Sequence, residues 1–472
     1  MNISDIIYKN NMESLADFIP LTSIQTEDDK KPYEERGYNI LFTEKEWASR
    51  FSISSQNMYY SNGLTPSMYY AELDHKPVPI IYRVFFLDKD KSVFNDDKEL
   101  EKALFSAVNT LKSGDVEEIE RYLSLLDGKL RIEVLRKFLE NSEPSPELYN
   151  TLIEFYLETD YGFDALPIEL VEKLAQKKSE EQKANTQEAL DDFLKGGEQF
   201  LIYRGQGSNS TPLDKALSWT LSMNTAYFFA CRRGFEEAAV YIAKVNRADV
   251  IEYIQGTEKE ILVLPKNVHV LQCDKIYGID DDALKLSPEL LQVYQCGEKL
   301  ITTLYDKWLK KSSKADVLQA KRVMLLAMEI FNVGQFPLSV KLLENLMSAA
   351  VFRDIGKDNG TSPSECAERS AWLYNKLVKP EEGLYDPKVE MLVRNYYLGD
   401  AEFMEKLRGS SLNSLERAEL LQIYAILKDA ETLACTTSDL RTFDVNSLRI
   451  KDSKKLVLFA VQLSKVRHIP MQ

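Results

Sequence analysis

The sequence has few of the residues that build metal sites and disulfide frameworks. It contains five cysteines, with no C-x-x-C pair, and three widely separated histidines, His75, His269 and His468. We therefore expect no metal. An odd number of thiols is typical of free cysteines in a reducing compartment, so we expect a cytoplasmic protein.

Long apolar runs are also missing. No stretch of about 18 consecutive apolar residues occurs, so no membrane span is expected. The first residues, MNISDIIYKNNMESLADFIP, lack the basic start and the apolar centre of a secretory signal. We expect no membrane partner.

Basic residues are fewer than acidic residues, and the net charge is −15. Such a protein does not attract nucleic acid through its overall field, although a local basic patch can still do so. Hydrophobic residues make up 44% and charged residues 28%, as in ordinary globular proteins. A chain of 472 residues suggests about two to four domains.

The pattern predicts an α+β chain in three parts. Residues 1–95 form an irregular α+β segment, with a short helix begun by Thr43 and a buried strand in PVPIIYRVFFLD. Residues 96–285 are one domain, helical over 96–197 and strand-rich over 198–285. The strand-rich part is the one block of closely spaced strands that the pattern predicts.

Six strands are predicted in that block, in EQFLIYRGQG, KALSWTLS, AAVYIAKVN, DVIEYIQ, KEILVLP and NVHVLQ. A helix in MNTAYFFACRRG follows the second strand, with Ser222 as its N-cap and Phe229 buried.

Residues 286–472 read as an all-α domain. Three places show an apolar helix, a tight turn and a second apolar helix, with the turns in NVGQF, LGDAE and LKDAE. Paired helices of this kind are found in helical repeats. The irregular spacing of the turns leaves a repeat arrangement open.

Polar residues gather at the predicted strand ends. Arg204 ends an apolar strand, and Gly205 after it lets a ligand or a backbone approach. Ser218 and Thr220 share one face of the next strand. Glu258 and Glu260 would share a face of a later strand, where like charges repel. The pair is therefore either a solvated strand end or part of a site.

These residue types suit a substrate with a pyrophosphate and a labile sugar–base bond. A guanidinium matches phosphate, and strand hydroxyls can orient a sugar or a carboxylate. A fixed carboxylate stabilises the oxocarbenium-like state of glycosidic cleavage. NAD is such a substrate.

An aromatic-Arg-Gly strand end, a Ser-x-Thr strand before an aromatic helix, and Glu-x-Glu before an apolar strand resemble the R-S-E, cholera-toxin-like class of mono-ADP-ribosyltransferases. The resemblance covers about residues 200–272 and implies that class's split β core, preceded by helices. It also implies NAD as the substrate.

The resemblance implies roles for particular residues. Arg204 would grip the phosphate and ribose side of NAD, and Ser218 would support the site. Glu260 would hold the nicotinamide ribose and stabilise the cation, while Glu258 would activate the acceptor. Further residues are implied in NAD binding: Gly205, Thr220, and Tyr227 or Phe228 as a face for the nicotinamide ring.

The chain departs from the class in two respects. Its middle motif is Ser-Trp-Thr rather than the commoner Ser-Thr-Ser, and little chain lies between Arg204 and Ser218. Close kinship with the larger secreted toxins is therefore in doubt. The histidine-containing class is excluded, because none of the three histidines lies near a strand-end tyrosine and upstream of Glu260 in the order that class requires.

The implied function is transfer of ADP-ribose from NAD to a macromolecule with release of nicotinamide. Glu-x-Glu resembles the arginine-modifying members and favours a protein arginine. RNA or DNA is the rival acceptor, which the basic cluster of Arg232, Arg233, Lys244 and Arg247 permits.

An intracellular toxin or effector is implied, such as a toxin–antitoxin or anti-phage component, whose helical segments bind a target, a neutralising antitoxin or a regulatory protein. Two other readings stay open. One is an NAD glycohydrolase, in which water is the acceptor. The other is a catalytically inert scaffold that carries helical interaction domains.

Overall fold

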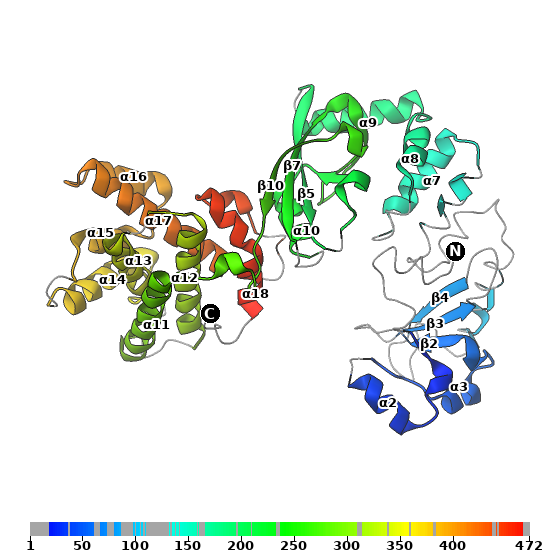
Figure 1. Cartoon of the computed structure of the whole chain (residues 1–472), viewed down its shortest axis with the longest axis horizontal. Helices are drawn as coiled ribbons and strands as arrows, with labels where there is room; N and C mark the ends of the chain where they lie inside the picture. Colours follow the sequence, from blue (N-terminus) through cyan, green and yellow to red (C-terminus); the bar gives the residue numbers. More distant parts are fainter. Residues whose placement is uncertain are drawn as a thin grey trace. The chain divides into compact units, whose positions relative to one another are not determined.

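A computed structural model describes residues 18–35, 38–60, 67–72, 80–85, scattered positions from 98 to 140, 142–157, 159, 166–194, 197–208, 210–232, 237–308, 314–337, 339–357, 360–380, 384–436, 440 and 443–465. The chain divides into two compact units. Unit 1 comprises residues 1–196 with 211–217 and 264–266, and unit 2 comprises the remainder. Helices and strands together make an α+β protein (Figure 1).

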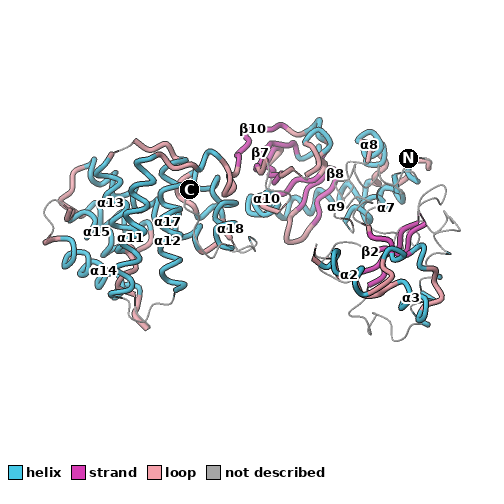
Figure 2. Tube along the Cα trace, turned by 60° about the horizontal axis from the view of Figure 1, so that its bottom comes forward, coloured by secondary structure: helices cyan, strands magenta, loops and turns pink. Residues whose placement is uncertain are grey.

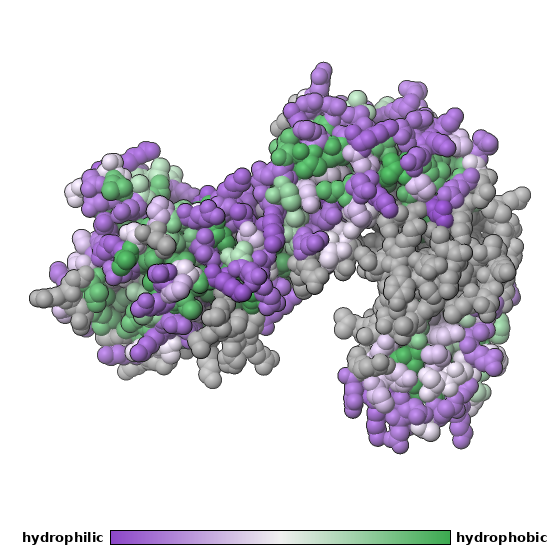
Figure 3. All heavy atoms as spheres, in the orientation of Figure 1, coloured by the Kyte–Doolittle hydropathy of each residue, from purple (hydrophilic) through white to green (hydrophobic). Residues whose placement is uncertain are grey.

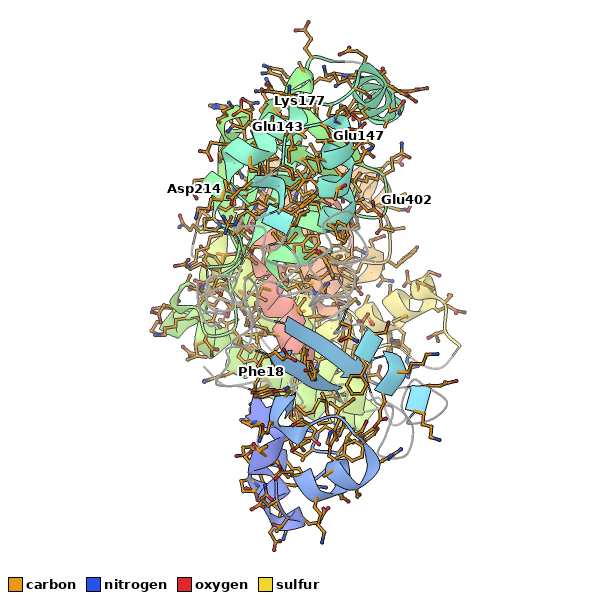
Figure 4. All side chains as sticks on the ribbon, turned by 90° about the vertical axis from the view of Figure 1, so that its right-hand side faces the viewer. Phe18, Glu143, Glu147, Lys177, Asp214 and Glu402 are labelled. Carbon is orange, nitrogen blue, oxygen red and sulfur yellow. The ribbon has the colours of Figure 1, made fainter. Side chains whose placement is uncertain are left out.

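The N-terminal part of unit 1 is a small antiparallel sheet. Its strands are β1 (Ile19–Pro20), β2 (Met58–Tyr60), β3 (Ser67–Glu72) and β4 (Ile80–Phe85), hydrogen-bonded in that order. Phe18, labelled in Figure 4, packs against Tyr69 of β3 with ring centroids 5.2 Å apart. Strand β4 lies in the predicted segment PVPIIYRVFFLD. The prediction that residues 198–285 hold the one block of closely spaced strands is wrong, because β1, β2 and β3 form a second sheet with β4.

Among the described residues of unit 1, two helices lie between β1 and β2 in the sequence, and three more follow β4. They are α2 (Glu27–Glu34), α3 (Glu44–Arg50), α7 (Pro146–Leu157), α8 (Ile168–Ala175) and α9 (Glu180–Leu194). Thr43 caps α3 as predicted, since its hydroxyl accepts a hydrogen bond from Glu46 N at 3.3 Å. Gly197, with φ of 113°, adopts the left-handed conformation that favours glycine, just beyond the end of α9.

Unit 2 opens with six antiparallel strands. They are β5 (Gln199–Gln206), β6 (Ser218–Thr220), β7 (Ala239–Asn246), β8 (Val250–Ile254), β9 (Glu260–Val263) and β10 (His269–Lys275). The first five fall within the predicted segments, and β10 begins in the sixth, NVHVLQ, and continues to Lys275. Their order in the sheet is β10-β7-β5-β6-β9-β8. The two halves, β10-β7-β5 and β6-β9-β8, meet at the pair Tyr203 and Thr220.

Helix α10 (Met223–Ala230) covers one side of the β5–β7 half (Figure 1). Ser222 caps it as predicted, with its hydroxyl accepting from Thr225 N at 3.2 Å. Ala226, Tyr227 and Val240 belong to the same hydrophobic core as the C-terminal helices. The strand-rich part and residues 286–472 therefore fold as one compact body.

The C-terminal part of unit 2 is helical, and Figure 2 draws no strand among its described residues. Its helices are α11 (Pro288–Trp308), α12 (Lys314–Val333), α13 (Val340–Phe352), α14 (Pro363–Val378), α15 (Pro387–Asn395), α16 (Asp400–Arg408), α17 (Ser414–Ala434) and α18 (Val457–Lys465). The all-α prediction is confirmed.

On the face drawn in Figure 3, hydrophilic side chains separate small apolar patches.

Two of the three predicted helix hairpins are present, α12–α13 and α15–α16, with Gly334 and Gly399 at their turns. The third is wrong, because α17 runs unbroken through LKDAE, which contains good helix formers and no glycine or proline. Helix α17 packs against α12 as well as α13, α15, α16 and α18. A linear repeat array, in which each repeat contacts its sequence neighbours, does not have this arrangement.

Glu329 on α12 is fully buried and gives unit 2 a pH-dependent stability. Neither carboxylate oxygen makes a hydrogen bond of normal geometry to the described residues. Burial raises its pKa from 4.5 to about 8, and the nearby Asn332 side chain offsets part of that rise. Between these values the folded protein holds a proton that the unfolded chain has released. Stability therefore falls as pH rises through this range.

We expect Glu329→Gln to flatten that dependence. Between pH 5 and 8 the unfolding free energy of the wild type should fall more steeply with pH than that of the variant. The two slopes should differ by at most about 1.4 kcal/mol per pH unit. Urea unfolding of both proteins at several pH values measures the two slopes. Equal slopes would mean that Glu329 is ionised in the folded protein.

Candidate active site

Arg204 connects β5 to β6. Its side chain lies on the same face of β5 as the buried Ile202, as the sequence predicts, and is itself half-buried. Arg204 Nη1 donates to the backbone oxygen of Ser218 at 2.7 Å. The guanidinium is thus held beside the first residue of β6.

Ser218 connects β6 to β9. The two strands are paired, with Thr220 opposite Glu260 and Ser218 opposite Leu262. Ser218 Oγ donates to Glu260 Oε1 at 2.5 Å. The arginine, the serine and the glutamate predicted from the sequence therefore lie in one connected series across β5, β6 and β9, and the serine hydroxyl fixes the orientation of the carboxylate.

Glu258 lies outside the strand. Strand β9 begins at Glu260, and Lys259 has φ of 48°, which interrupts the alternation of side chains. The prediction that Glu258 and Glu260 share a strand face is therefore wrong. Glu258 sits on an exposed turn beside the site, whereas Glu260 is half-buried within it.

The turn that carries Glu258 is tied to the end of β6 by its backbone. Thr220 Oγ1 donates to Glu258 O at 2.5 Å and accepts from Ser222 N at 2.9 Å. Leu221 N donates to Lys259 O at 3.0 Å. The hydroxyl of Thr220 thus links the Glu258 turn to the residue that caps α10.

Gly205 faces the backbone of α10. A Cβ atom at this position would lie 2.5 Å from Ala230 N and closer still to Ala226 O, both backbone atoms. Only glycine therefore lets α10 approach β5 this closely. The structure places Gly205 in this packing contact rather than on an open face.

The aromatic residues of α10 differ in exposure. Tyr227 is 2% exposed, and burial raises the pKa of its hydroxyl. Phe228 is half-buried, and the Arg232 guanidinium lies 5.6 Å from the centre of its ring. Of the two candidates for the nicotinamide face, Phe228 is the less buried. Phe229 is also half-buried, so the prediction that it is buried is wrong.

The predicted basic cluster lies on several elements. Arg232 follows α10 and is exposed, Lys244 is exposed on β7, and Arg247 begins the short 3-10 helix Arg247–Asp249. Arg233 lies outside the described residues. The structure leaves Arg232 and Lys244 accessible to an anionic surface.

Within the described parts of the chain, no three His, Cys, Asp or Glu side chains are grouped so that they could hold a metal ion. Among the helices of those parts, none has both the length and the apolar character of a membrane span. Comparison of the chain with family models, with curated proteins and with solved structures finds no match in any of the three.

Proposed function

We propose that the protein is a mono-ADP-ribosyltransferase that uses NAD as its substrate. The observation that carries the proposal is the connected series Arg204, Ser218 and Glu260 across three strands of one sheet. The sheet supports it further, because its two halves meet at one residue pair, as expected of a split β core.

Each residue of the series suits one part of NAD. The planar guanidinium of Arg204 matches the pyrophosphate in a way that a lysine ammonium does not. The carboxylate of Glu260 faces the ribose carbon that becomes positively charged as its bond to nicotinamide breaks. Ser218 holds that carboxylate in one orientation, which lowers the reorganisation needed in the transition state.

Glu258, on the exposed turn, takes part in the second half of the reaction, in which the acceptor attacks the ribose. The electron pair of the broken bond leaves with nicotinamide, and the acceptor nucleophile attacks the ribose carbon. Glu258, exposed and adjacent in sequence to the site, accepts the proton that the nucleophile loses. A guanidinium of a protein arginine is the acceptor that Glu-x-Glu favours, with RNA or DNA as the rival.

A transfer assay tests this function. Tagged NAD, the protein and a cell lysate are incubated together, and the products are treated with protease or with nuclease. Label that protease removes identifies a protein acceptor, and label that nuclease removes identifies RNA or DNA. Nicotinamide release without label identifies an NAD glycohydrolase. Intact NAD in every sample would contradict the proposal and favour a scaffold.

Arg204→Lys should raise the KM for NAD about tenfold, because lysine keeps the charge but loses the planar fork and the contact with Ser218 O. Steady-state rates of nicotinamide release over a range of NAD concentrations measure the change. Arg408→Lys, on an exposed part of α16, is the matched control and should leave the KM unchanged. An unchanged KM in Arg204→Lys would remove Arg204 from the NAD site.

A further inference from the structure

The first turn of α10 is held by a segment far along the chain. Asn224 Oδ1 accepts from Val445 N at 3.0 Å, and Asn224 Nδ2 donates to Asp444 Oδ1 at 3.3 Å. Val445 begins the short 3-10 helix Val445–Ser447, which follows α17 in the helical part of unit 2. One amide side chain therefore joins α10 to the C-terminal region by two hydrogen bonds.

A second contact reinforces the first. Lys454 Nζ lies 3.5 Å from Met223 Sδ, and Met223 is the first residue of α10. Asp444 is itself held, because its carboxylate accepts from Asn446 N at 3.0 Å. The C-terminal segment is thus ordered by its own hydrogen bonds and presents a fixed surface to α10.

From α10 the contacts continue to the Glu258 turn. Ser222, the N-cap of α10, donates its backbone N–H to Thr220 Oγ1, which donates in turn to Glu258 O. The adjacent Leu221 N donates to Lys259 O. An unbroken series of contacts therefore runs from Asp444 and Val445 to the turn that carries Glu258.

We propose that the C-terminal helical region positions Glu258 through Asn224. This inference rests on the proposed function, because Glu258 matters there as the group that receives the acceptor's proton. Asn224 is a positioning residue and does not touch the substrate. Glu260 is held separately by Ser218 Oγ and by the β6–β9 pairing. Loss of Asn224 should therefore impair transfer to an acceptor more than cleavage of NAD.

The test compares two rates in one protein. Nicotinamide release without acceptor measures cleavage, and labelling of an acceptor measures transfer, with poly-arginine as the acceptor probe. Asn224→Ala should lower the ratio of transfer to cleavage about threefold to tenfold, the effect of losing ordinary hydrogen bonds. Asp444→Ser should act in the same direction, because serine can still cap Asn446 N but is too short to reach Asn224.

Asn446→Ala is the matched control. This asparagine is exposed, lies two residues beyond Asp444, and makes its hydrogen bond to Asp444 through its backbone N–H, which alanine keeps. The ratio should stay at the wild-type value. An unchanged ratio in Asn224→Ala, or an equal fall of both rates, would overturn the proposal, since the second result indicates a merely structural role.

Hydrogen exchange separates this inference from the proposed function. In Asn224→Ala the amide of Leu221 should exchange several-fold faster than in wild type, because its acceptor, Lys259 O, lies on the released turn. Unchanged exchange overturns the link whatever the enzyme activity. Faster exchange in a protein that leaves NAD intact supports the link and overturns the proposed function alone.

Discussion

Glu260→Gln is expected to lower the rate of nicotinamide release from NAD about a hundredfold or more. Glutamine has almost the same size and can still accept a hydrogen bond from Ser218 Oγ, so the geometry of β9 is kept. The change removes the negative charge that faces the developing oxocarbenium. The loss should appear in kcat, because the interaction is made chiefly in the transition state.

The control is the same chemical change on the neighbouring strand. Glu252 on β8 lies opposite Leu262 of β9, within the same half of the sheet. Glu252→Gln should leave kcat within about twofold of wild type, since no developing charge lies beside it. Both variants should melt close to the wild-type temperature, which excludes unfolding as the cause of lost activity.

Near-normal turnover in Glu260→Gln would remove Glu260 from catalysis. The hydrogen bond from Ser218 would then be a structural contact between two strands. This result would favour the alternative of a catalytically inert scaffold. A loss of turnover shared equally by Glu252→Gln would point instead to a general effect of charge on this half of the sheet.

The strands of unit 2 could be predicted because each is a short apolar or alternating run, such as the buried run of β9 and the alternating second half of β7. In β7, residues Ala243 and Val245 are buried while Lys244 and Asn246 between them are exposed. In β5, Ile202 is buried between the exposed Leu201 and the partly buried Tyr203. Alternation of this kind fixes which face carries Arg204, so its position could be predicted without a structure.

The position of Glu258 could not be predicted in the same way. Two glutamates with one residue between them share a face only if the chain stays extended, and Lys259 has a left-handed conformation instead. Lysine carries no signal for such a conformation, unlike glycine or asparagine. The contact of Asn224 with Asp444 could not be predicted from the sequence either, because the two residues lie 220 positions apart.

Gly205→Ala is expected to destabilise unit 2 by about 1–3 kcal/mol or more. The new methyl group would collide with Ala226 O and Ala230 N, and backbone atoms cannot rotate away as a flexible side chain can. Either α10 must move off β5 or the strand must bend. Urea unfolding and the melting temperature of both proteins measure the loss.

Gly256→Ala supplies the matched control, because a Cβ atom there meets nothing within 4 Å. Its unfolding free energy should stay within about 0.5 kcal/mol of wild type. If Gly205 instead served to let NAD approach the strand, Gly205→Ala would keep normal stability and raise the KM for NAD. A large fall in melting temperature for Gly205→Ala alone would establish that this glycine exists for the packing of α10. The side chain of Arg204 points to the opposite face of β5 from that packing contact.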